Sequence, residues 1–225
     1  MIRACLFDFW ITLVEIDQLD IPTRKERFRD FLKVAKDIFD HCYDETATIA
    51  DRLRERFAKE VTSRDFIQLL LKRLEIGDDP VDDLDRIYRE AVLDLDLRLR
   101  EGAKEVLNYL RSKYRIGLIS NTSVGKVVRQ LLKRFDIERY FDSIVLSDEI
   151  GIRKPEPYIF HYALRRLDTP PEQAVFIGDS PYLDVLGARR CGIYAIYLSR
   201  GEEYPPHLPR PDLIIDGLAS LLDRL

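Results

Sequence analysis

The sequence is short of the residues that build zinc sites and disulfide frameworks. It has only three cysteines and three histidines in 225 residues. Cys5, Cys42 and Cys191 lie far apart, with no C-x-x-C pair and no cysteine–histidine cluster. This spacing excludes the common zinc-binding patterns. We interpret the three thiols as buried apolar side chains.

Long apolar runs and basic clusters are also missing. No apolar segment approaches the roughly 20 residues that span a bilayer. The first residues lack the longer apolar stretch and the cleavage site of a signal peptide. The net charge is −4, so we expect no nucleic acid and no membrane among the partners. We predict a cytoplasmic protein that acts on a small molecule, and the oligomeric state stays open.

The residues that are present have the composition of a folded domain, with 46% hydrophobic and 34% charged residues. Residues 2–7 form an apolar run that is too short for a helix and predicts a buried strand. Apolar residues then recur at helical spacing in four stripes, at 28–39, 49–61, 66–74 and 84–92. These stripes predict four amphipathic helices that form a small bundle.

Beyond residue 96, predicted strands and helices alternate. Strands are expected at 116–119, 143–146, 174–177, 193–197 and 213–215. Helices are expected at 103–110, 124–135, 157–167 and 181–190, and at the C-terminus. This alternation predicts an α/β fold with a Rossmann-like parallel sheet and helices on both faces. Because the strand at 2–7 needs partners, residues 1–15 and 96–225 should form the α/β core, and residues 16–95 an inserted helical domain.

Polar residues gather where the predicted strands end. Ligands of an open parallel sheet bind beyond the carboxyl ends of its strands, so these residues are the candidates for a site. They are Asp8 and Thr12, Ser120 and Asn121, Lys154, and Asp179 and Asp184.

The residue types fit one kind of chemistry. Three carboxylates repel one another unless a cation or protons compensate, and oxygen ligands without histidine or cysteine favour Mg²⁺. A metal with a lysine and hydroxyl donors makes a pocket for a phosphoryl group. A carboxylate that faces the phosphorus can attack it and form an aspartyl-phosphate.

The ordered motifs resemble those of the haloacid dehalogenase superfamily. Its first motif, D-x-D-x-T-L after an apolar strand, is matched at residues 8–13, and its second, a strand that ends in serine or threonine, at 117–122. The Lys-Pro of the third motif is at 154–155, and the G-D-S-x-x-x-D of the fourth at 178–184. The helical insertion resembles the four-helix cap of that family, and the resemblance covers nearly the whole chain.

The resemblance implies a role for each acidic residue. Asp8 would be the nucleophile and a ligand of Mg²⁺, Asp179 a second ligand, and Asp184 a ligand or a partner of the ligands. The main-chain carbonyl of Trp10 would complete the metal shell. The activity implied is that of a Mg²⁺-dependent phosphatase that acts on a small phosphorylated metabolite.

The resemblance also assigns the other polar residues. Lys154 and Ser120 would hold the transferred group, and Lys154 would in addition anchor the nucleophile. Thr12 would position the nucleophile loop, and Asn121 would shape the substrate pocket.

Two residues depart from the first motif. Trp10 stands where phosphatases of the family have the second Asp, which protonates the leaving group; such acid–base help is typically worth about 10²–10⁴ in rate. The Trp10 ring could contact substrate or pack beneath the hinge of the helical domain. Ile11 replaces a frequent glycine, so we expect a somewhat different turn.

Four functions are compatible with this departure. The first is a phosphatase without that acid, which should favour aryl or acyl phosphates. The second is a 2-haloacid dehalogenase, because halide leaves without a proton, and the third is a non-catalytic binding protein. The fourth is a phosphonoacetaldehyde hydrolase with a Schiff-base lysine on the cap, for which the candidates are Lys25, Lys33, Lys36, Lys59 and Lys72. The three carboxylates favour the phosphatase, because a haloacid anion would be repelled by them.

Overall fold

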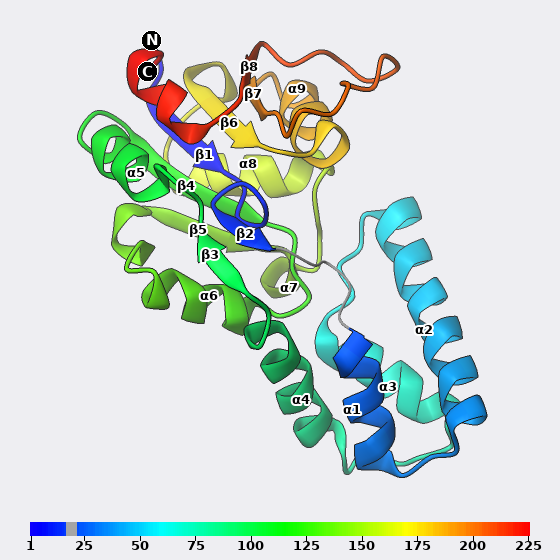
Figure 1. Ribbon diagram of the computed structural model, residues 1–225. Helices are drawn as coiled ribbons and strands as arrows, with labels where there is room; N and C mark the ends of the chain where they lie inside the picture. Colours follow the sequence, from blue (N-terminus) through cyan, green and yellow to red (C-terminus); the bar gives the residue numbers. More distant parts are fainter. Residues whose placement is uncertain (17–21) are drawn as a thin grey trace.

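A computed structural model describes residues 1–16 and 22–225 and contains a six-stranded parallel sheet (Figure 1). The strand order is β5-β4-β1-β6-β7-β8, which confirms the predicted α/β fold. The strands are β1 (Ala4–Phe7), β4 (Arg115–Ser120), β5 (Ser143–Leu146), β6 (Ala174–Gly178), β7 (Tyr194–Leu198) and β8 (Leu213–Ile215).

Strand β1 lies at the centre of the sheet. Its four residues are all fully buried, and it pairs in parallel with β4 on one side and β6 on the other. The chain adds β4 and β5 on one side of β1, and then crosses to β6, β7 and β8 on the other side. In such sheets the point at which strand order reverses is where ligands bind, and here it lies beside the end of β1.

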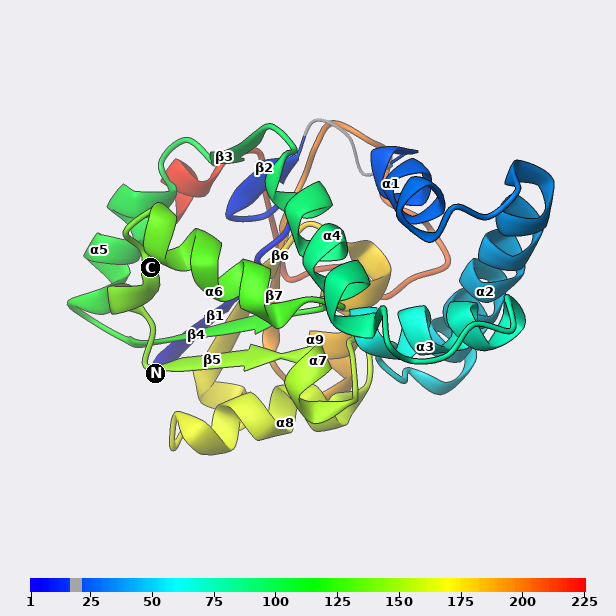
Figure 2. The same cartoon turned by 90° about the horizontal axis from the view of Figure 1, so that it is seen from below.

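Helices cover both faces of the sheet (Figure 2). Side chains alternate along β1, so that Cys5 and Phe7 face one hydrophobic cluster and Ala4 and Leu6 face the other. The first cluster includes residues of α5 (Ala103–Arg111) and α6 (Gly125–Arg134), and the second includes residues of α8 (Pro157–Arg166) and α9 (Gly187–Arg190). A short helix, α7 (Ser147–Ile150), follows β5.

Four further helices lie beyond the carboxyl ends of the strands, in the direction in which the arrowheads of β4 and β5 point in Figure 2. They are α1 (Pro22–Leu32), α2 (Lys36–Phe57), α3 (Ser63–Arg73) and α4 (Val81–Leu93). The predicted insertion also contains residues 17–21, which lie outside the described residues. Among the described residues, no helix has both the length and the apolar character needed to cross a membrane.

The predicted boundary between the first two of these helices was wrong. The stripe at 28–39 spans two helices, because α1 ends at Leu32 and Lys33 has a left-handed backbone with φ of 54°. Ile38 and Phe57, which we assigned to buried stripes, are 59% and 72% exposed. Apolar spacing continues through the turn, so periodicity alone does not mark the break.

The elements that were not predicted include the short helix α7 and two strands. Strands β2 (Val14–Ile16) and β3 (Leu97–Leu99) form an antiparallel pair at the two ends of the helical segment. They are too short for a recognisable alternation of polar and apolar residues. The expected C-terminal helix is a run of 3₁₀ turns at Leu218–Asp223.

Candidate active site

Three carboxylates meet at the carboxyl ends of the two central strands. Asp8 follows β1, Asp179 follows β6, and Asp184 lies in the π-helical turns at Pro181–Leu186. Each of the three offers an oxygen within 4.8 Å of those of the others. The Asp8 amide continues the sheet pairing by donating to the Ile177 carbonyl, at 2.9 Å. The sheet itself therefore aligns the first two carboxylates.

Lys154 joins two of these carboxylates. Its Nζ lies 2.6 Å from Oδ1 of Asp8 and 2.6 Å from Oδ1 of Asp184, and its side chain is 2% exposed. The Lys154 amide donates to Oδ1 of Asn121 at 2.8 Å, and Nδ2 of Asn121 donates back to the Lys154 carbonyl at 3.0 Å. Asn121 thus holds the loop that carries Lys154, besides lining the adjoining cavity.

The remaining motif residues hold Asp184 and Asp179 in place. The Ser180 amide donates to Oδ2 of Asp184 at 2.9 Å, and the buried Thr12 hydroxyl donates to Oδ1 of Asp179 at 3.2 Å. A Cβ atom at Gly178 would lie 2.4 Å from the Asp184 carboxyl carbon. The G-D-S sequence is therefore explained by close packing, because only glycine leaves room for that carboxylate.

The site carries more negative charge than its one lysine balances. Burial raises the pKa of Asp8 to about 7; Asp184 and Asp179 add to the rise, and Lys154 opposes it. Burial, together with Asp184, raises the pKa of Asp179 to about 6. Although burial favours the neutral form of Lys154, Asp184 and Asp8 raise its pKa. A divalent cation would offset both the cost of burying these carboxylates and their mutual repulsion.

Ser120 supplies a free hydroxyl near these groups. It is the last residue of β4, the strand that pairs with β1, and it is fully buried. Its Oγ has no hydrogen-bond partner among the residues that the structure describes. A buried hydroxyl without a partner costs free energy, which makes this atom a candidate contact for a bound ligand.

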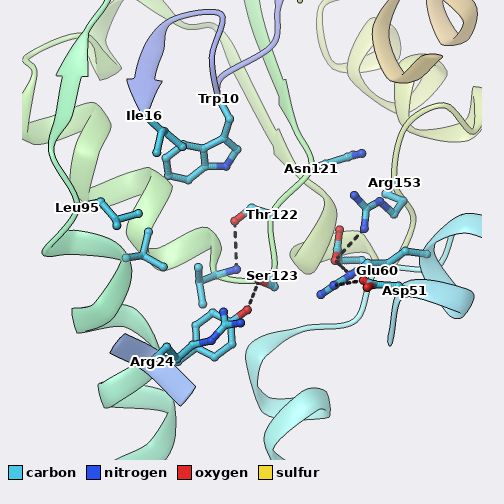
Figure 3. Close-up of a pocket in the computed structure, with 14 residues that line it drawn as sticks. Trp10, Ile16, Arg24, Asp51, Glu60, Leu95, Asn121, Thr122, Ser123 and Arg153 are labelled. Carbon is cyan, nitrogen blue, oxygen red and sulfur yellow. Dashed lines mark hydrogen bonds and ion pairs between the residues drawn. The ribbon is translucent and has the colours of Figure 1, made fainter. Parts of the chain in front are cut away.

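The two departures from the first motif lie in the turn after Asp8. The Trp10 ring packs edge-on against Phe9, with centroids 4.9 Å apart, and lines a cavity of about 430 Å³ (Figure 3). Ile11 has φ of 66°, in the left-handed region that favours glycine, so the turn has a conformation suited to glycine at this residue. A non-glycine residue there costs roughly 1–2 kcal/mol. Nε of Arg100 donates to the Ile11 carbonyl at 3.1 Å and helps to hold the turn.

The cavity beside Trp10 is lined by residues that motif matching did not find. They come from the four-helix segment and from the loops after β4 and α7, and they include Arg24, Arg54, Glu60, Tyr88, Ser123 and Arg153. No motif contains the residues from the helical segment, and Arg153, which directly precedes the Lys-Pro of the third motif, was assigned no role. These residues come together only in the folded chain. The five lysines considered for a Schiff base line neither this cavity nor the neighbouring one beside Lys154.

Comparison with known proteins identifies the family. A family model described as haloacid dehalogenase-like hydrolase matches residues 2–192. The chain belongs to this family. The parallel sheet and the order of the four motifs agree with this membership. The chain is therefore a hydrolase.

Full-length relatives of this hydrolase are phosphatases. A glyceraldehyde 3-phosphate phosphatase of Methanopyrus kandleri is 32% identical, over 99% of this chain and 97% of that protein. A protein of the same name from Pyrococcus furiosus is 26% identical, over 100% of this chain and 93% of the relative.

Solved structures show the same fold. A haloacid dehalogenase-type phosphatase from Thermococcus onnurineus has a TM-score of 0.69 and 26% identity, over 99% of this chain and 97% of that one. A 2-haloacid dehalogenase from Pseudomonas syringae has a TM-score of 0.75 over the same shares, but at 22% identity this likeness concerns the fold alone.

Proposed function

We propose that this hydrolase is a Mg²⁺-dependent phosphatase of a small phosphorylated metabolite, with Asp8 as its nucleophile. The observation that carries the proposal is the convergence of Asp8, Asp179 and Asp184 within 4.8 Å. Side chains of these three residues, with the main-chain carbonyl of Trp10, would hold the ion. Bound there, Mg²⁺ would neutralise charge on the phosphoryl oxygens.

The chain's own residues supply the nucleophile and bind the transferred group. A carboxylate oxygen of Asp8 forms a bond to phosphorus while the ester oxygen leaves with its electron pair. Lys154 and the free hydroxyl of Ser120 donate to the transferred group, and Thr12 keeps Asp179 in place. Water then cleaves the aspartyl-phosphate, which releases phosphate and restores the carboxylate. Solvent supplies the proton for the leaving oxygen, because Trp10 has none to give.

The domain division is part of the proposal. We infer that residues 1–15 and 96–225 form the catalytic core and that residues 16–95 form a cap over the site. Supporting this division, β2 and β3 pair at the two ends of the helical segment, and residues of α1, α2 and α4 line the cavity beside Trp10.

The direct test is phosphate release with and without the metal. With Mg²⁺, the protein should hydrolyse 4-nitrophenyl phosphate. It should also hydrolyse glyceraldehyde 3-phosphate, the substrate that appears in the names of two relatives. Removal of the ion with a chelator should lower kcat by at least about 10²-fold, because the phosphoryl charge then lacks several kcal/mol of stabilisation. Added Mg²⁺ should restore the rate.

The same protein sample separates the phosphatase from a dehalogenase. Release of chloride from 2-chloropropionate at a rate that a chelator does not change, with no release of phosphate, would refute the proposal. In that result the three carboxylates would serve some purpose other than metal binding.

The absence of an acid at Trp10 predicts a steep dependence on the leaving group. Aryl and acyl phosphates should react faster than alkyl phosphates, because their leaving groups need little protonation. Trp10→Asp should raise kcat/KM for glycerol 3-phosphate by about 10²-fold and change that for 4-nitrophenyl phosphate much less. Rates over a series of esters graded by leaving-group pKa measure both effects.

Trp10→Phe is the matched control, because it keeps an aromatic ring and adds no acid. It should leave the dependence on the leaving group as steep as in the unaltered protein. If Trp10→Asp and Trp10→Phe lower kcat/KM equally for all substrates, the Trp10 ring itself contributes to the reaction. In that case position 10 is not where the missing acid acts.

A further inference from the structure

Two cavities meet beside the proposed reaction centre. The first, of about 430 Å³, is lined by Trp10 and Asn121, and the second, of about 580 Å³, by Lys154 and Ser180. The three charged residues Asp51, Arg54 and Arg153 line both. A leaving group attached to phosphorus beside Lys154 would therefore extend past these charges.

The first cavity contains more guanidinium groups than buried carboxylates. Arg24, Arg54 and Arg153 line it, whereas Glu60 is its one buried acid among the described residues, at 3% exposure. Glu60 is largely occupied, because its Oε2 accepts from the Ser147 hydroxyl at 2.6 Å and its Oε1 from the Val61 amide at 3.1 Å. The side chain of the other acid, Asp51, is 62% exposed, so water screens its charge.

Arg54 and Arg153 share the Glu60 carboxylate unequally. Nε of Arg54 lies 3.4 Å from Oε1, and this side chain also donates to the Val61 carbonyl at 3.0 Å and to Asp51 at 3.2 Å. Nη1 of Arg153 lies 3.7 Å from Oε1 and makes no hydrogen bond to any residue that the structure describes. The guanidinium of Arg153 therefore has donors to spare.

The backbone holds Arg153 firmly, although its guanidinium makes no hydrogen bond to the described residues. The Arg153 amide donates to the Ala58 carbonyl at 3.0 Å, and Lys59 and Ile152 form an antiparallel bridge. Burial lowers the pKa of Arg153, Glu60 opposes this, and Arg54 adds to it. A partly buried guanidinium, 18% exposed, whose nearest carboxylate is 3.7 Å away and already accepts other hydrogen bonds, is suited to binding a further anion.

The opposite wall of the cavity is apolar. Figure 3 shows Trp10, Ile16 and Leu95 together on the side away from Arg153 and Glu60. Arg24 lies at another edge, where it stacks on Tyr88 with 4.2 Å to the ring centroid and donates to the Tyr43 hydroxyl at 3.0 Å. The cavity thus offers an apolar surface on one side and a cation with free donors on the other.

We propose that this cavity holds a leaving group that carries a second negative charge, and that Arg153 binds this charge. The inference rests on the proposed phosphatase function and adds a preference: among phosphate esters, those with an anionic group beyond the ester oxygen should be the better substrates. An uncharged leaving group of the same shape would leave the donors of Arg153 without a partner.

A pair of substrates of equal size tests the assignment. 4-Carboxyphenyl phosphate and 4-carbamoylphenyl phosphate differ in the charge of one group, and the full chain with Mg²⁺ should give the higher kcat/KM with the carboxylate. Arg153→Gln should lower the ratio of the two kcat/KM values by about 10–100-fold, the range for a lost hydrogen bond to a charged group. Arg153→Lys should lower the ratio less, because lysine keeps the positive charge and loses only the paired donors of the guanidinium.

The ratio does not depend on how much of a variant is folded, so it separates recognition from stability. Arg64→Gln is the control, since Arg64 is exposed and pairs with Asp82 at 2.8 Å, and it should leave the ratio unchanged. An unchanged ratio of the two kcat/KM values in Arg153→Gln would overturn the inference. So would a ratio that falls in Arg24→Gln but not in Arg153→Gln. Failure to hydrolyse either compound and 4-nitrophenyl phosphate would instead refute the phosphatase function.

Discussion

Asp8→Asn is expected to lower kcat for 4-nitrophenyl phosphate by about 10⁴-fold or more, the size of loss seen when a nucleophile is removed. The amide cannot attack phosphorus, and it also loses the negative charge that faces Lys154 and the proposed ion. The protein should still fold, because Lys154 keeps its 2.6 Å contact with Asp184. Phosphate release and circular dichroism measure the two properties.

A second buried aspartate provides the control for this substitution. Asp85 is 5% exposed, accepts from the Ser63 hydroxyl at 2.6 Å and does not belong to the carboxylate cluster. Asp85→Asn should keep kcat within a few-fold. If Asp8→Asn kept a comparable rate, Asp8 would not be the nucleophile. Mass spectrometry of denaturant-quenched protein should detect a phosphoryl adduct that Asp8→Asn lacks.

Lys154→Met is expected to cause the largest loss of stability among single substitutions at the site. It leaves Asp8 and Asp184 buried without their cation, and breaking a buried ion pair from one side costs about 3–5 kcal/mol. For a chain of this size that corresponds to a fall in Tm of roughly 6–20 °C. Thermal unfolding in a chelator measures the effect, and Mg²⁺ should recover part of it.

Lys104→Met is the surface counterpart. Lys104 pairs with Asp136 at 2.8 Å, but both side chains are about half exposed. Exposed pairs contribute about 0–1 kcal/mol, so Tm should change by no more than a few degrees. Equal shifts in Tm for the two lysine variants would contradict the view that Lys154 neutralises a buried acidic cluster.

The fold could be read largely from local patterns. The strands at 116–119, 143–146, 174–177 and 213–215 are close to the observed ones, because buried strands are marked by short apolar runs between turn residues. The prediction missed β2 and β3, each of three residues, and placed the first break in the helical segment wrongly. Such features depend on contacts with distant residues that leave little trace in local periodicity.

The site could be read only in part. Parallel strands bring their carboxyl ends to one edge, so the positions of Asp8 and Asp179 followed from the order of strands and helices. The partners of Lys154 did not follow from that order. The resemblance implied its contact with Asp8, whereas its contact with Asp184 and its two hydrogen bonds with Asn121 are seen only in the folded chain. Arg153 directly precedes the Lys-Pro of the third motif, but neither it nor Glu60 was predicted to line a cavity.

Taken alone, the amino-acid sequence determined the class of fold, the order of its elements and the three carboxylates that face one edge of the sheet. These follow from short-range periodicity and from the rule that parallel strands end together. The tertiary structure decided that β1 is central, that one lysine joins two acids, and that Arg153 lines the same cavity as Trp10, with no hydrogen bond from its guanidinium to the described residues. Those properties depend on side chains far apart in the chain, and only packing brings such residues into contact.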